Sequence, residues 1–219
     1  MTETELEAAE KKRKRNKTIF AVSIGAVFGF LGAMVGLEMA DSGMLGEFDP
    51  SREIALLVGL VYILTAVAVL FGLASPKAGA TFLNVEDAEE LREEKAMLGY
   101  SGIGMAAAGI SLIVVALAGE NGLIDPWVAL AIYAVLTVVA TAVSLASRKH
   151  QDELMRAVGQ ECGALAFYLV VFTGGTWALL AHLGLASGPA PLDWLTMFWG
   201  LLLLSAFIVT GKRGMLEMR

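Results

Sequence analysis

The sequence contains little of what holds a soluble domain together. Cys162 is its single cysteine, so no disulfide can form within the chain, and the redox compartment stays open. Charged residues make up 17% of the 219 residues, whereas a soluble domain usually carries about 25%. Hydrophobic residues reach 57%, and the mean hydropathy is +0.68. This composition is typical of a membrane protein.

Charge is also missing from the places where a pump or a voltage sensor needs it. The sequence contains six apolar runs, and none has Asp, Glu, Lys or Arg at its predicted midplane. The runs span residues 18–40, 54–75, 97–118, 128–147, 163–185 and 195–211. A transmembrane helix needs about 20 mostly apolar residues, and its backbone must satisfy its own hydrogen bonds in lipid. The sequence therefore predicts an all-α, multi-pass membrane protein with six transmembrane helices.

The basic residues indicate how these helices cross the membrane. In a six-span arrangement, Arg52 lies alone on one side, and the other fifteen of the sixteen lysines and arginines lie on the opposite side. Basic residues flanking transmembrane helices are concentrated in the cytoplasm. We therefore expect both termini in the cytoplasm, including the tail 212–219. The Ala- and Gly-rich helices favour a plasma membrane, the inner membrane of a bacterium.

Two charged segments of opposite sign precede membrane helices. The N-terminal segment 1–17 contains six basic residues: Lys11, Lys12, Arg13, Lys14, Arg15 and Lys17. Six acidic residues lie between Glu86 and Glu94, where they are interpreted as the solvated face of a cytosolic helix. The basic segment could bind anionic lipid headgroups, each cation contributing on the order of 1 kcal/mol. Alternatively, it could pair with the acidic segment.

The chain reads as three successive helical hairpins. An aspartate stands before each even-numbered run, at Asp49, Asp125 and Asp193, and we expect each to cap the helix that follows. Leu64-Thr65 and Leu73-Ala74-Ser75 recur 72 positions later in the fourth run, which supports repetition of the first two hairpins. The third and fifth helices are predicted to extend into the cytosol over residues 84–96 and 151–162, because no proline interrupts them.

Glycines mark the expected helix contacts. Small residues allow membrane helices to approach closely, and this packing drives their association in lipid. The candidate contact positions are Gly25, Gly29, Gly32, Gly36, Gly102 and Gly109. Gly174 and Gly175, in the middle of the fifth run, predict a packing notch, with a broken helix at a binding site as the alternative.

Two functional hypotheses follow. The first is a non-enzymatic bundle that acts through helix packing, as an accessory subunit or by self-assembly. The second is a small-solute or ion transporter or channel, with Glu38, Glu161 and His182 as candidate polar positions. Cys162, His150 and His182 do not form a metal motif, and no nucleophile stands beside a base. We expect no enzymatic activity and no cofactor; the expected partners are the bilayer and another membrane protein or copy, not nucleic acid.

The charge distribution yields a topology prediction. A reporter that is active only outside the cytosol, fused after Arg219, should stay silent because the C-terminus is expected in the cytoplasm. The same reporter fused in the loop that contains Arg52 should be active. A strong signal from the C-terminal fusion would overturn this orientation.

Overall fold

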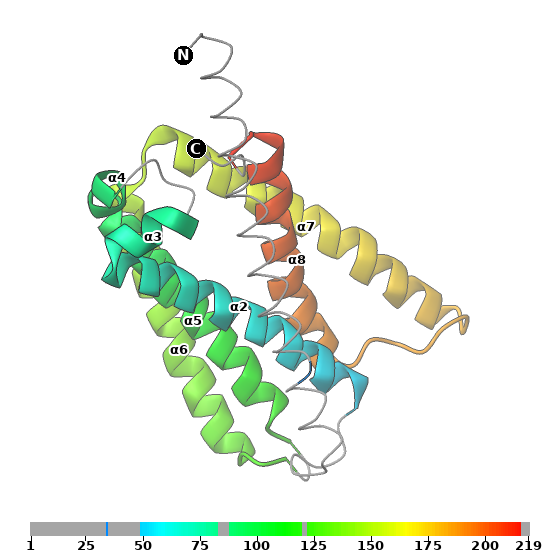
Figure 1. Ribbon diagram of the computed structural model, residues 1–219. Coiled ribbons are helices and arrows are strands. Elements are labelled where there is room, and N and C mark those ends of the chain that lie inside the picture. Colours follow the sequence, from blue (N-terminus) through cyan, green and yellow to red (C-terminus); the bar gives the residue numbers. More distant parts are fainter. Residues whose placement is uncertain (1–33, 35–48, 83–87, 120–121, 216–219) are drawn as a thin grey trace.

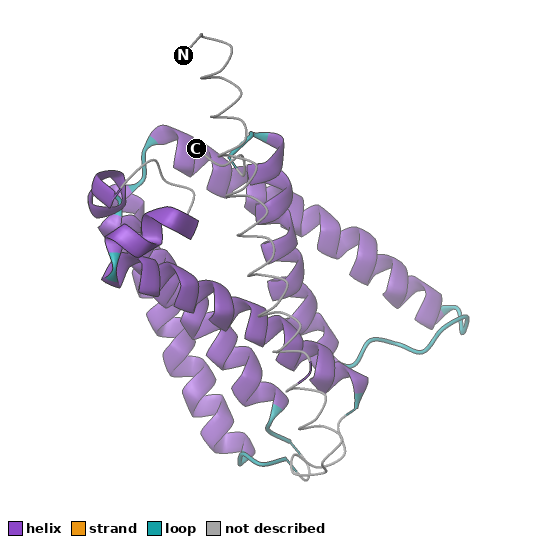
Figure 2. Ribbon diagram, in the orientation of Figure 1, coloured by secondary structure: helices purple, strands orange, loops and turns teal. Residues whose placement is uncertain are grey.

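The computed structural model describes residue 34 and residues 49–82, 88–119 and 122–215. The model is 85% helical, and the described ranges contain no strand. The main helices are α2 (Pro50–Ala74), α5 (Lys95–Ala116), α6 (Pro126–Ser147), α7 (Glu153–His182) and α8 (Pro191–Lys212) (Figures 1 and 2). All five are long and apolar enough to cross a membrane. The protein is thus helical and membrane-embedded.

Several sequence predictions fall outside this described part. The first predicted span, 18–40, is not described apart from residue 34, so Gly25, Gly29, Gly32, Gly36 and Glu38 have no structural account. The basic residues Lys11, Lys12, Arg13, Lys14, Arg15 and Lys17 also lie outside the described residues. Their predicted roles stay predictions.

Two of the three predicted aspartate caps are confirmed. The Asp49 carboxylate accepts a hydrogen bond from the amide of Arg52 at 2.9 Å, and the Asp125 carboxylate accepts from Trp127 at 2.9 Å. The prediction for Asp193 was wrong in position, because α8 starts at Pro191 and Asp193 lies in its first turn. Its carboxylate accepts from the amide of Ala190 at 2.7 Å. Pro191 is suited to the first helical position, since its missing N–H has no helical partner there.

Helices α2 and α5 cross with almost no side chain between their backbones. A Cβ built at Gly109 of α5 would lie 2.7 Å from the carbonyl oxygen of Gly59 in α2. The neighbouring interior is lined by small residues as well, including the buried Ala55, Ala66 and Ala108. Helix α6 packs on another side of α5, where a Cβ at Gly104 would contact Val143 of α6 at 3.6 Å. Together α2, α5 and α6 form one bundle.

The segment between α2 and α5 differs from the predicted helical extension. It contains two short helices, α3 (Pro76–Phe82) and α4 (Ala88–Glu93), and a turn at Glu94 separates α4 from α5. Leu91 of α4 is fully buried, and its side chain lies 2.7 Å from the position of a Cβ at Gly79 in α3. This burial holds α4 against α3, so residues 88–93 do not project as a straight continuation of α5.

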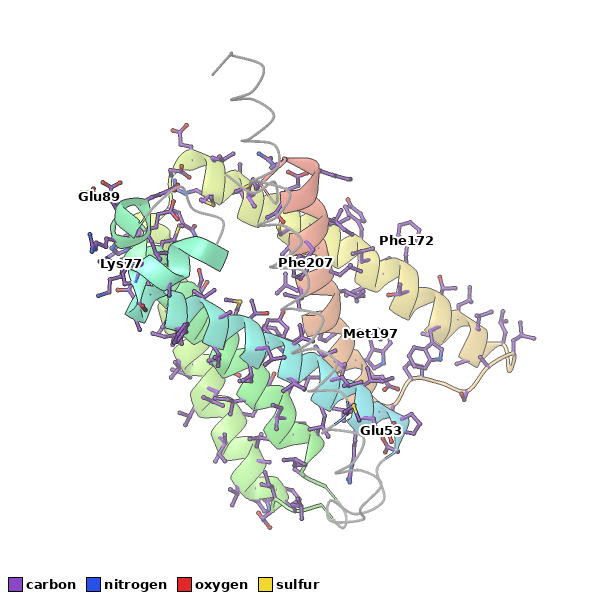
Figure 3. The ribbon with its side chains drawn as sticks, in the orientation of Figure 1. Glu53, Lys77, Glu89, Phe172, Met197 and Phe207 are labelled. Carbon is purple, nitrogen blue, oxygen red and sulfur yellow. The ribbon has the colours of Figure 1, made fainter. Side chains whose placement is uncertain are left out.

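Helices α7 and α8 form a second group (Figure 1). The predicted extension 151–162 belongs largely to α7, which is unbroken through Gly174 and Gly175 and capped by the Asp152 carboxylate. A Cβ at Gly174 would lie 2.7 Å from the Trp194 ring of α8, so this residue forms a close helix contact, whereas a Cβ at Gly175 would meet nothing within 4 Å among the described residues. Met197 of α8 lies on this same side (Figure 3).

One contact point ties the two groups together near the middle of the helices. The hydroxyl of Tyr62 in α2 donates a hydrogen bond to the carbonyl of Trp199 in α8 at 2.9 Å, and the two rings meet edge to face at 5.9 Å. A Cβ at Gly200 would meet the Val58 side chain at 3.7 Å, within ordinary van der Waals contact. Helix α8 therefore contacts α2 through the buried Tyr62, the partly buried Trp199 and the neighbouring Gly200.

The α2–α5 crossing predicts an unequal effect of two identical substitutions. Gly109→Ala places a methyl group 2.7 Å from a backbone oxygen, and overpacking of this kind costs about 1–3 kcal/mol. The thermal midpoint in detergent should fall. In the control variant Gly175→Ala the new methyl group meets nothing within 4 Å among the described residues, so the midpoint should hold or rise. Equal midpoints for the two variants would show that the backbones do not approach at Gly109.

Candidate functional site

A groove of about 520 Å³ opens between the two helix groups. Its walls come from α2, α5, α6 and α8, and about half of its described lining side chains are apolar. Hydroxyl groups lie among them and belong to Tyr62, Ser101, Ser111, Thr137, Thr141 and Ser144. Among the described lining residues Arg148 alone is charged, and it lies just beyond the end of α6.

The groove reaches the central turns of the helices. Tyr62 lies at the middle of α2, Thr137 at the middle of α6, and Met105 at the middle of α5. A hydrocarbon core is about 30 Å thick, so the middle of a spanning helix of this length lies near the membrane midplane. Polar atoms therefore line a hollow at the depth where a bilayer offers no hydrogen-bond partner.

Some of these hydroxyl groups are already used by the protein. The Thr141 hydroxyl donates to the carbonyl of Thr137 at 2.8 Å, as threonines in helices usually do. The hydroxyls of Ser111, Thr137 and Ser144, by contrast, make no hydrogen bond within the part of the chain that the structure describes. These three groups can bond to a molecule in the groove.

A second, more polar pocket of about 610 Å³ adjoins the groove at the end of α6. It shares Ser144 and Arg148 with the groove, so the two hollows adjoin each other at these residues. Its other lining residues come from the start of α7 and the connection before it: Gln151, Arg156, Gly159 and Gln160. The combined site thus has an uncharged interior and a cationic mouth.

The polar residues predicted from the sequence lie elsewhere. Glu161 of α7 forms an ion pair with Arg213 after α8, with 2.7 Å between the guanidinium nitrogen and the carboxylate oxygen. Because both side chains are more than a third exposed, this pair is a surface contact between α7 and α8. His182 is exposed at the last residue of α7, so the structure does not bring it together with Glu161.

The predicted packing glycines of α5 lie against α2, away from the groove. A Cβ at Gly102 would lie 2.9 Å from the Leu70 side chain, while Gly109 meets Gly59 as described above. The side chains that form the groove were not singled out from the sequence. One signal was available: Thr137, Thr141, Ser144 and Arg148 are spaced four, three and four residues apart, which places them on one face of α6.

The described residues hold no group of three or more His, Cys, Asp or Glu side chains placed to bind a metal ion. Cys162 is buried between α7 and α8, packed with Val158 and Val209. No protein-family model, curated protein or solved structure matches this chain. The case for function therefore rests on the helices and the groove themselves.

The aromatic contact beside the groove can be tested with a matched pair of variants. Tyr62→Phe keeps the ring but removes the hydrogen bond to the Trp199 carbonyl, which is worth about 0.5–1.5 kcal/mol. The free energy of unfolding in mixed detergent should fall by that amount. Tyr133→Phe on α6 is the control, because the Tyr133 hydroxyl has no bonding partner among the described residues. If both variants unfold like the unaltered protein, α8 is not held to α2 at this point.

Proposed function

We propose that the chain spans the membrane six times, as three helical hairpins with both termini in the cytoplasm, in the inner membrane of a bacterium. The adjacency of α5 with α6 and of α7 with α8 supports two of these hairpins. The ends of α6 and α8 and the start of α7 carry Arg148, Arg156 and Arg213, and Arg52 begins α2 at the opposite end. This distribution supports the orientation.

Within that architecture, the role proposed is a non-enzymatic one that depends on helix packing, as an accessory subunit or a self-assembling bundle. The observation that carries it is the surface of α7. This helix packs along α8, but Phe167 and Phe172 are exposed, and Phe172 points away from α8 (Figure 3). Gly163 and Gly175 meet nothing within 4 Å of a built Cβ among the described residues.

Open glycines on a membrane helix favour contact with another helix. A glycine costs helix stability, and close approach of a second backbone is the usual compensation in lipid. Large aromatic side chains beside such positions add contact area at little conformational cost. A partner helix packed on α7 would approach closely at the open glycines and contact the exposed aromatic side chains.

Crosslinking in native membranes tests this surface. Phe172→Cys, in a background with Cys162→Ala and labelled with a benzophenone maleimide, should form covalent products on ultraviolet irradiation because a partner helix lies against α7, and this reaction needs no cysteine on the partner. A product of twice the mass indicates self-assembly, and a product of another mass indicates an accessory role. The control is Val138→Cys on α6, which is 68% exposed compared with 71% for Phe172. If Phe172→Cys yields no more product than the control, α7 faces lipid and the packing role is contradicted.

The second candidate is a small-solute or ion transporter, which the groove favours. Hydroxyl groups without protein partners at the depth of Thr137 can bind a polar solute in place of water. The transporter hypothesis would remain if α7 proves to face lipid. The groove is lined by α2, α5, α6 and α8, and none of its described lining residues belongs to α7.

A further inference from the structure

The described residues that line the pocket at the end of α6 are all polar except one glycine. Arg148 follows α6 directly, and Arg156 lies in the first turns of α7, so two guanidinium groups face one hollow. Gln151, Gln160 and Ser144 add amide and hydroxyl groups. Guanidinium groups present rigid forks of N–H donors that fit the oxygens of phosphate and carboxylate groups.

The positive charge in this pocket is not neutralised by the described protein. Neither Arg148 nor Arg156 takes part in an ion pair within the described ranges. The described lining contains no carboxylate: Asp152 caps α7 through the amide of Met155 at 2.7 Å, Glu161 pairs with Arg213, and Glu153 is an exposed residue outside the lining. The pocket is therefore electrostatically suited to an anion.

The shape of the pocket leaves room for one. A Cβ built at Gly159 would meet nothing within 4 Å among the described residues, so no neighbouring side chain covers this wall. The Gln151 amide donates to the buried Ser147 hydroxyl at 3.4 Å, which holds this side chain at the edge of the pocket. With a volume of about 610 Å³, the hollow is large enough for a phosphate group and the atoms attached to it.

The position of the pocket selects the kind of anion. It lies where the apolar run of α6 gives way to Arg148, Lys149 and His150, which is the level of lipid headgroups. It adjoins the groove at Ser144 and Arg148, and the groove walls include Leu136, Ala140 and Leu145. A ligand that fills both hollows has an anionic phosphate at one end and an apolar chain at the other.

We propose that Arg148 and Arg156 bind the phosphate of an anionic phospholipid whose acyl chain enters the groove between α6 and α8. This assignment does not depend on the packing role of α7, because the pocket uses residues 156–160 at the start of that helix and neither Phe167 nor Phe172.

Native mass spectrometry of the full chain in neutral detergent tests the site. The protein is offered equal amounts of phosphatidylglycerol and phosphatidylcholine with the same acyl chains. The unaltered protein should retain phosphatidylglycerol preferentially. Arg148→Gln with Arg156→Gln should weaken that preference about tenfold or more, since hydrogen bonds to charged groups are lost. The control Lys77→Gln with Lys149→Gln removes the same net charge from exposed residues outside the pocket and should keep the preference.

A steric pair tests the pocket without changing charge. Gly159→Phe fills the open wall and should abolish the preference, whereas Ala157→Phe, at an exposed residue of the same helix outside the pocket lining, should preserve it. Position 159 opens onto free space among the described residues and Ala157 is exposed, so both proteins should fold. Thermal midpoints close to that of the unaltered protein verify this.

Competition identifies the source of the phosphate. Inorganic phosphate and glycerol 1-phosphate, at the concentration of the lipid, should not displace phosphatidylglycerol because they lack the acyl chain. Displacement by either would overturn the lipid assignment and leave a site for a soluble phosphate. Equal loss of preference in the arginine and lysine double variants would overturn the pocket itself, since net charge alone would then explain the binding.

Discussion

The backbones of α2 and α5 approach each other at Gly59 and Gly109, and the positions of the other helices follow from that crossing. In lipid, apolar side chains gain little by contacting one another instead of acyl chains, so helices associate through close packing. The crossing fixes one face of α2 on α5 and leaves Tyr62 to reach α8. Helix α6 uses a different face of α5, beside Gly104. The groove is the space left between these contacts.

Sequence reasoning predicted the long helices well because membrane solvation determines them. The observed α2, α5, α6, α7 and α8 coincide with the apolar runs to within a few residues, apart from the longer start of α7, which the predicted extension anticipated. Proline and aspartate marked the starts of α2 and α6. The predicted start of α8 was wrong because Asp193 is a residue type that suits a cap position, whereas Pro191, two residues earlier, is the first residue of the helix.

The bounds of the short helices α3 and α4 could not be predicted from the sequence pattern, for a physical reason. Pro76 after α2 indicated an interruption, and the seven residues of α3 are too few to show a helical period. The turn at Glu94 depends on the burial of Leu91 beside Gly79, a contact between residues 12 positions apart that local propensity does not encode. Tertiary packing overrides propensity most easily in segments this short.

The candidate site was missed because its parts lie on four helices. Each hydroxyl, taken alone, is an ordinary residue of a membrane helix, and only the packing of α8 against α2 shows that Thr137 and Ser111 face one hollow. The search for ionisable residues led instead to Glu161 and His182, since charge inside a membrane is expensive and usually functional. In this fold Glu161 stays at the surface with Arg213 as its partner.

The distribution of charge along the groove limits what it can hold. An ion at the depth of Thr137 would have no countercharge from the described lining side chains, and the hydroxyl groups would replace only part of its hydration. The cost falls toward Arg148, where an anion gains a guanidinium partner and contact with water. An uncharged molecule or an apolar chain avoids the penalty in the interior. A ligand with its negative charge at the mouth and its apolar part inside therefore matches the groove better than a free ion does.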